Sequence, residues 1–181
     1  MKQPTLDLGT CSAIMDGPYR YRLDRIWDAG KACLAFIMLN PSTADETDDD
    51  PTLRRCLHFA QRGAVYGGLI VVNLFAWRAT DPSDLIREEQ AGTDVVGPKN
   101  DEAVRTAATV ADDAVCAWGA MGGLFPARAN HVLAILREIG AKTHSLGLTK
   151  NRSPKHPLYL PNHTALTPFC PEGDHYEKKA P

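Results

Sequence analysis

The hydrophobic and polar residues alternate along the chain in segments that predict strands. Residues 19–27 (YRYRLDRIW) switch between apolar and charged side chains, a pattern typical of a half-buried strand. Residues 28–31 indicate a turn, and the apolar run 33–39 (CLAFIML) predicts a fully buried strand. We therefore expect 19–27 and 33–39 to form a hairpin, and 69–75 to form a further strand.

Helices are predicted between these strands by capping residues and by the helical spacing of apolar side chains. Asp50 suits the N-cap of a helix and Pro51 its first position, so we expect a helix over 52–66, ended by two glycines at 67–68. The same Asp-Pro pattern at 81–82 starts a short helix. The other expected elements are helices over 100–111 and 126–139 and short strands over 114–118 and 143–146.

Strands that alternate with helices predict an α/β protein built as a three-layer sandwich. Its central sheet is expected to be mainly parallel, with helices on both faces. At 181 residues the chain is long enough for one domain with a substantial core. We divide it into an N-terminal arm or loose strand (1–18), a single α/β domain (19–168) and a C-terminal tail (169–181) that we expect to fray.

Composition and charge argue against several classes of protein. The formal net charge is −2 and the pI is about 6.3, so any contact with phosphate must come from a local basic patch. The five cysteines are widely spaced without a CxxC pair, which disfavours a zinc ribbon or an iron–sulfur cluster. There is no apolar signal region and no stretch of about 18 apolar residues. We expect a reduced, cytoplasmic, monomeric protein without membrane contact.

Two asparagines follow the two long apolar runs. Asn40 follows the first, in the segment Asn40-Pro41-Ser42, and Asn73 ends the second. Because the carboxyl ends of parallel strands meet at one edge of a sheet, where ligands of open α/β folds bind, we expect the two asparagines to converge. A carboxamide both donates and accepts hydrogen bonds, which suits reading a nucleobase edge or holding a water. The alternatives are a simple turn with a helix cap at 40–42 and a loop-bracing role for Asn73.

Aromatic and basic side chains are expected at the same edge. The aromatic residues after the strands are Phe75, Trp77 and Trp118, and the loop 147–160 contributes Lys150, Arg152, Lys155 and His156. Aromatic rings stack on bases and cations hold phosphates, so this set suits a nucleotide. The alternatives are core positions for the aromatic rings and an ordinary surface loop for the cations.

We predict no metal and no cofactor. The acidic run 45–50 lacks the glycine and the terminal glutamate of a calcium loop, and it indicates a solvated loop with a helix cap. The other histidines have no metal-ligand spacing and are expected to be structural or solvated: His58, His131, His144, His163 and His175. The Walker, GxGxxG, GxSxG and HExxH motifs are missing, which disfavours the classes of enzyme that use them.

The motifs together resemble an uncharacterised family of bacterial and phage proteins. The segments that carry this resemblance are LNPSTAD (39–45), DDPT (49–52), VVNLFAWRATDP (71–82), ND (100–101), AWG (117–119) and SPKHPLYLP (153–161). The resemblance covers roughly residues 19–160. It implies no activity.

More distantly, the layout is similar to the uracil-DNA glycosylase superfamily. The resemblance implies that fold and a metal-free DNA glycosylase site, in which Asn40 positions the attacking water, Asn73 reads the base and His156 assists the leaving base. Leu158 or Tyr159 would enter the gap left in the duplex. The chain departs from the pattern at three positions: Ser42 replaces a glycine, position 40 carries Asn rather than Asp, and Leu158 replaces a serine.

The leading hypothesis is therefore an N-glycosidic hydrolase that flips a base, which can be a modified one, out of DNA or acts on a modified nucleotide. Pro41, Ser42, Phe75 and Trp118 would complete the base pocket with Asn73, and the loop cations would hold phosphates. One alternative is a nucleotide- or nucleic-acid-binding module of the same fold without catalysis. Another is a metal-dependent nucleotide hydrolase that uses Asp45, Asp48, Asp49 and Asp50.

Overall fold

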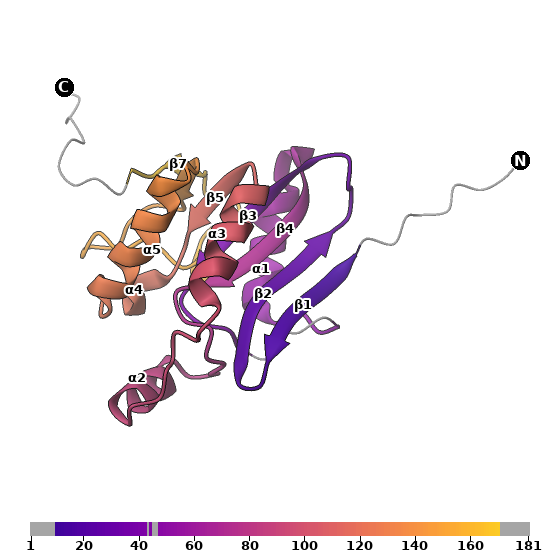
Figure 1. Ribbon diagram of the computed structural model, residues 1–181. Helices are drawn as coiled ribbons and strands as arrows, with labels where there is room; N and C mark the ends of the chain where they lie inside the picture. The colour runs from indigo at the N-terminus through magenta and orange to yellow at the C-terminus, as the bar shows by residue number, and fades with distance from the viewer. Residues whose placement is uncertain (1–9, 43, 45–46, 171–181) are drawn as a thin grey trace, which may run out of the picture.

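The computed structural model describes residues 10–42, 44 and 47–170, and shows an α/β structure built on one mixed sheet (Figure 1). In the described part the sheet has seven strands in the order β1-β2-β4-β3-β5-β6-β7. The middle strands β4, β3, β5 and β6 are parallel, whereas β1, β2 and β7 pair antiparallel with their neighbours. The strands are β1 (Cys11–Asp16), β2 (Tyr19–Ile26), β3 (Ala32–Met38), β4 (Tyr66–Asn73), β5 (Asp113–Cys116), β6 (Thr143–Ser145) and β7 (Thr167–Pro168).

Helices cover both faces of the sheet. They are α1 (Pro51–Gln61), α2 (Pro82–Gln90), α3 (Asn100–Val110), α4 (Gly119–Gly122) and α5 (Pro126–Glu138), with 3-10 turns η1 (Arg62–Ala64) and η2 (Pro157–Tyr159). Leu53 of α1 and Phe36 of β3 belong to the core on one face, while Val104 of α3, Val132 of α5 and Ile37 of β3 belong to the core on the other. Figure 1 shows α1 on one side of the sheet and α3 and α5 on the other. Successive residues of β3 point to opposite faces, so one buried strand supplies both cores.

The hairpin that the sequence predicts between 19–27 and 33–39 is wrong. Strand β2 forms its hairpin with β1 and pairs antiparallel with β4, so that β4 lies between β2 and β3. The uniformly apolar run of β3 suits the middle of the sheet, where it pairs in parallel with β4 and β5. The alternating pattern of β2 suits a position nearer the edge.

The two glycines expected to end the first helix lie inside a strand instead. Helix α1 ends at Gln61, and β4 begins at Tyr66. A Cβ atom at position 67 would collide with the carbonyl oxygen of Asp28, and one at position 68 would lie 2.6 Å from Cys33 Sγ. Gly67 and Gly68 are therefore required for close packing within the sheet.

The sheet includes residues outside the range 19–168. Strand β1 occupies part of the expected arm, and Phe169 N donates to Thr143 O over 2.9 Å. The rest of the expected arm and tail, 1–9 and 171–181, lies outside the described residues.

The carboxyl ends of three parallel strands lie side by side. Met38 of β3 pairs with Asn73 of β4, and Ile37 pairs with Cys116 of β5. The segments that follow these strands begin at the same edge of the sheet, as the parallel arrangement requires.

Candidate functional site

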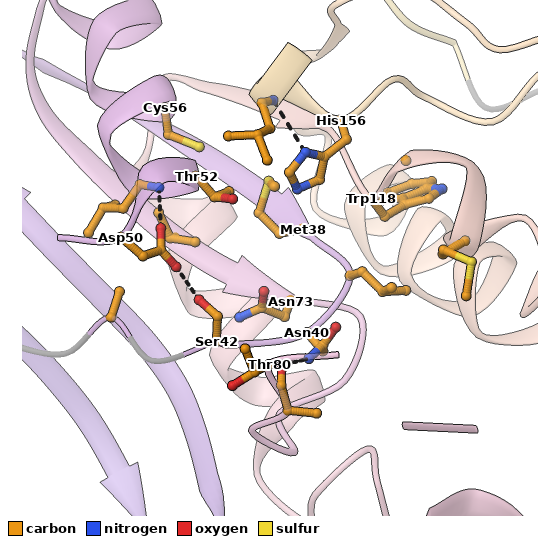
Figure 2. Close-up of a pocket in the computed structure, with 18 of the residues that line it drawn as sticks. Met38, Asn40, Ser42, Asp50, Thr52, Cys56, Asn73, Thr80, Trp118 and His156 are labelled. Carbon is orange, nitrogen blue, oxygen red and sulfur yellow. Dashed lines mark hydrogen bonds between the residues drawn. The ribbon is translucent and has the colours of Figure 1, made fainter. Parts of the chain in front are cut away.

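A cavity of about 550 Å³ lies at this edge, within the size range of small-molecule sites. Seven of the residues that we expect in the site line it: Asn40, Ser42, Asn73, Trp118, His156, Leu158 and Tyr159. The wall also contains residues that the sequence did not single out, among them Arg20, Met38, Thr52, Cys56 and Thr80. The expected convergence of the strand ends is thus observed (Figure 2).

Asn73 is the most unusual residue of the cavity. Its side chain is only 1% exposed, yet neither Nδ2 nor Oδ1 has a hydrogen-bond partner. A buried amide without partners costs about 1–3 kcal/mol, so such groups are rare unless something else satisfies them. Figure 2 shows the carboxamide in the middle of the cavity. It presents one donor group and one acceptor to a ligand.

The backbone at Asn73 is held from the opposite side of the strand. Asn100, at the start of α3, donates from Nδ2 to Asn73 O (3.0 Å) and to Leu74 O (2.9 Å). Arg128 of α5 donates from Nε to Leu74 O (2.6 Å) and from Nη1 to Asp101 (2.6 Å). These bonds fix the end of β4 and therefore the direction of the Asn73 side chain.

His156 presents one ring nitrogen to the cavity. Its Nδ1 accepts a hydrogen bond from Leu158 N at 3.2 Å, so in the neutral ring the proton lies on Nε2. Burial lowers the pKa of His156, and the nearby charge of Asp50 opposes this shift. Figure 2 shows the edge of the ring that carries Nε2 facing the cavity. The residue is therefore arranged as a neutral Nε2–H donor.

A tight turn after β5 supports His156. Gly119 has a φ of +73°, and a Cβ atom there would lie 3.0 Å from His156 Cβ. Gly119 N donates to Pro154 O (2.9 Å), and Ser153 Oγ donates to Gly119 O (2.6 Å). Trp118 is 3% exposed and packs closely against Gly122, so its ring is a rigid part of the wall.

Asp50 and Ser42 form a second polar group at the wall. Asp50 caps α1 by accepting from Leu53 N (2.6 Å) at Oδ1, and Ser42 Oγ donates to its Oδ2 (Figure 2). The preceding residue, Asp49, pairs with Arg25 at 2.8 Å. In the described part of the chain no three His, Cys, Asp or Glu side chains form a possible metal site; Asp45 and Glu46 lie outside that part.

The side chain of Asn40 forms hydrogen bonds within the protein through one of its two polar atoms. Its Nδ2 donates to Pro41 O (3.1 Å) and to Ala79 O (2.8 Å), which fastens the loop after β3 to the segment before α2. Pro41 is buried and does not line the cavity. The carboxamide of Asn40 thus braces a loop and also belongs to the cavity wall.

The structure corrects the expectation for Phe75. Its ring is 1% exposed, packs edge-to-face on Phe125 with 4.8 Å between the ring centroids, and does not line the cavity. Phe75 follows the last residue of β4 and belongs to the core formed with α3 and α5, on the far face from α1. It is therefore not placed to stack on a ligand in the cavity.

The loop that carries Leu158 and Tyr159 lies at the mouth of the cavity. Tyr159 is 89% exposed and Leu158 is half-buried, and both line the cavity. Arg55 of α1, which the sequence did not single out, holds this loop by donating to Leu160 O and to Asn162 Oδ1, each at 2.6 Å. The cations Lys150 and Arg152 are exposed and Lys155 is half-buried; none of them lines the cavity.

Fold and site together define an α/β domain with a ligand-sized cavity at the carboxyl ends of its parallel strands. The chain belongs to the family described as Protein of unknown function (DUF1643), whose model matches residues 20–158. This confirms the expected membership of an uncharacterised family. No curated protein and no solved structure matches the chain. No helix in the described part is long and apolar enough to cross a membrane.

Proposed function

We propose that this protein is a DNA-glycosylase-like hydrolase that binds a flipped base in the cavity and cleaves its N-glycosidic bond without a metal. The observation that carries the proposal is the unpartnered carboxamide of Asn73, which is buried and faces a cavity. A base edge that offers a neighbouring donor and acceptor would satisfy both of its atoms. The substrate is a base, which can be modified, in DNA or in a nucleotide.

The cavity contains groups for each part of the reaction. The bond between C1′ and the base nitrogen breaks, and its electron pair passes to the base. Water oxygen forms the new bond to C1′, its proton passes to solvent, and the base takes a proton from solvent. His156 Nε2–H donates to the base as negative charge develops on it, and Asn40 Oδ1 accepts from the water.

The surroundings of the cavity are compatible with a DNA strand. Tyr159 is an exposed aromatic ring at the mouth and can fill the space that a flipped base leaves. Lys150, Arg152 and Lys155 belong to the adjoining loop and would contact phosphates. The uracil-DNA-glycosylase-like fold that the motifs imply is part of this proposal, as are a monomeric state and a cytoplasmic location.

A non-catalytic binding module is the second candidate, and one observation favours it. Asn40 Nδ2 is engaged with two carbonyls, so only an amide oxygen is left to act on a water. An amide oxygen orients water but is a poor base. The same cavity would then serve to bind a base without turnover.

An assay for abasic sites tests the proposal. Oligonucleotides with uracil, hypoxanthine or hydroxymethylated pyrimidines, single- and double-stranded, are incubated with protein and EDTA and then treated with alkali. The proposal expects strand cleavage that Asn73→Ala and His156→Ala abolish. His58→Ala is the matched control, because His58 lies on α1 outside the cavity. A shifted oligonucleotide without cleavage would favour the binding module, and loss of cleavage with EDTA would overturn the metal-free mechanism.

A further inference from the structure

The wall of the cavity contains a negative charge that the proposed reaction has not yet used. Among the residues that the structure describes, Asp50 is the only carboxylate that lines the cavity. A carboxylate has about four acceptor positions, and the bonds from Leu53 N and Ser42 Oγ occupy two. The ion pair with Arg25 is formed by Asp49, so Asp50 is not the residue that neutralises this arginine.

Helix capping uses only one of the two carboxylate oxygens of Asp50. Asp81 starts α2 with the same Asp-Pro pattern and accepts from Ser83 N at 2.8 Å, but it does not line the cavity. Asp50 differs because Ser42, from the loop after β3, holds its second oxygen at the cavity wall. Asn73, buried and without partners in the same cavity, is the independent sign that a ligand lies beside this carboxylate.

Glycosidic cleavage develops a charge that such a carboxylate can stabilise. When the bond at C1′ breaks, the sugar becomes a cation, and glycoside hydrolases place a carboxylate beside their similar, oxocarbenium-like transition state. A base held between Asn73 and His156 would leave its sugar near the polar wall that Asp50 forms with Ser42 (Figure 2). We propose that the Asp50 carboxylate faces the sugar of the bound nucleotide and stabilises positive charge on its ring. This inference rests on the proposed function.

The first test is the variant Asp50→Asn. Asparagine caps helices as well as aspartate does, and its amide can still bond Ser42, so the variant removes the charge and little else. We expect kcat to fall about 100-fold with KM changed less than about threefold, as for other lost transition-state contacts. The matched control Asp81→Asn removes a capping charge from α2 and should leave kcat within about twofold. Asp50→Ser, which keeps a capping oxygen, replaces Asp50→Asn if the latter does not fold.

The second test measures charge recognition without turnover. Two oligonucleotides carry abasic-site analogues of similar shape, one with a protonated pyrrolidine ring and one with a neutral tetrahydrofuran ring. Wild-type protein should bind the cationic analogue about tenfold or more tightly than the neutral one, because of the nearby carboxylate. Asp50→Asn should lose this preference and bind the neutral analogue as wild type does, while Asp81→Asn should keep it.

The two tests separate the inference from the proposed function. Equal binding of both analogues by wild type, or binding of neither, would overturn the inference, as would a preference that Asp50→Asn retains. A kcat of Asp50→Asn within about twofold of wild type would reduce Asp50 to a helix cap. If no substrate is cleaved but the preference depends on Asp50, the carboxylate faces the sugar as inferred and the hydrolase function is wrong.

Discussion

Two buried asparagines lie on opposite sides of the end of β4 and differ in what satisfies them. Asn73 is 1% exposed, and neither atom of its carboxamide has a partner. Asn100 is fully buried as well, but its Nδ2 bonds two backbone carbonyls and only Oδ1 is without a partner. The same side chain thus serves the fold in one place and, on the proposed function, a ligand in the other.

The difference shows how a buried polar group can be assigned to structure or to function. A buried polar group that stabilises the fold must find hydrogen-bond partners within the protein, because burial without partners destabilises the folded state. The Nδ2 group of Asn100 meets this condition at the backbone of Asn73 and Leu74, although its Oδ1 does not. On the proposed function, the Asn73 carboxamide finds partners only when a ligand fills the cavity, so the free energy lost by burying it without partners is recovered on binding.

Replacing Asn73 is expected to have the largest effect. Asn73→Ala should reduce turnover, or ligand affinity if the protein is a binder, by about 100-fold or more, because polar recognition sites reject poorly matched partners strongly. The free energy of unfolding should stay within about 1 kcal/mol of wild type, since no bond is lost. Kinetics and urea denaturation of the same preparation measure both. A large loss of stability with activity retained would show that Asn73 serves the fold and not a ligand.

The sequence predicts the features of the site that depend on where the strands end. Asn40 and Asn73 were expected at one edge because apolar runs mark parallel strands, and both line the cavity. The positions of β2 and β3 were not predictable in the same way, since a short turn after β2 lets β3 either pair with β2 as a hairpin or run antiparallel to it with another strand between them. Only the pairing of the whole sheet, with β4 inserted between them, decides this.

Asn100→Ala is expected to have the next largest effect, and on stability rather than on chemistry. It removes two hydrogen bonds that lie in the core, so the free energy of unfolding should fall by about 1–3 kcal/mol. Turnover per folded molecule should fall much less than in Asn73→Ala. Denaturation with urea and assays well below the melting temperature separate the two quantities. A turnover defect as large as that of Asn73→Ala, at unchanged stability, would contradict the division of roles.

Supporting residues of the site could not be predicted because their role depends on contacts between distant segments. Asn100 appears only as part of a short ND motif, and Arg128 lies within a helix without any local signal. Both act on Leu74, which is more than 20 residues away in the sequence. Phe75 shows the reverse case. It was expected in the cavity because it lies near the end of a strand, but its ring belongs to the core on the opposite face of the sheet.

The contribution of His156 to the free energy of unfolding is expected to be smaller and to depend on pH. Burial lowers its pKa below the usual value of 6.5, so protonation is less favourable in the folded protein than in the unfolded chain. Its contribution to stability is therefore complete above about pH 6.5 and is lost as the pH falls through the folded value. Protonation also converts Nδ1 from an acceptor into a donor and breaks the bond from Leu158 N, a loss of about 1 kcal/mol.

Denaturation of wild type and His156→Gln between pH 8 and pH 5 measures this effect, with the pH range chosen as about 1.5 pH units on either side of the usual histidine value. The variant has no titratable side chain at position 156, and the other histidines are common to both proteins, so the difference between the two proteins should shrink as the pH falls. Parallel curves would show that His156 is not the buried neutral donor that the cavity requires.

The smallest effect is expected for the exposed cations outside the cavity. Lys150 and Arg152 lie in a solvated loop, so on the proposed function each would contribute to binding of an oligonucleotide mainly by displacing counterions. Replacing either one with alanine should weaken binding a few-fold and lower the slope of log affinity against log salt by about 1. Lys142→Ala is the matched control, because Lys142 is exposed at the start of β6, at the end of the sheet opposite the cavity. If Lys142→Ala lowers the slope equally, the attraction for the oligonucleotide is a general property of the protein surface and not of the loop beside the cavity.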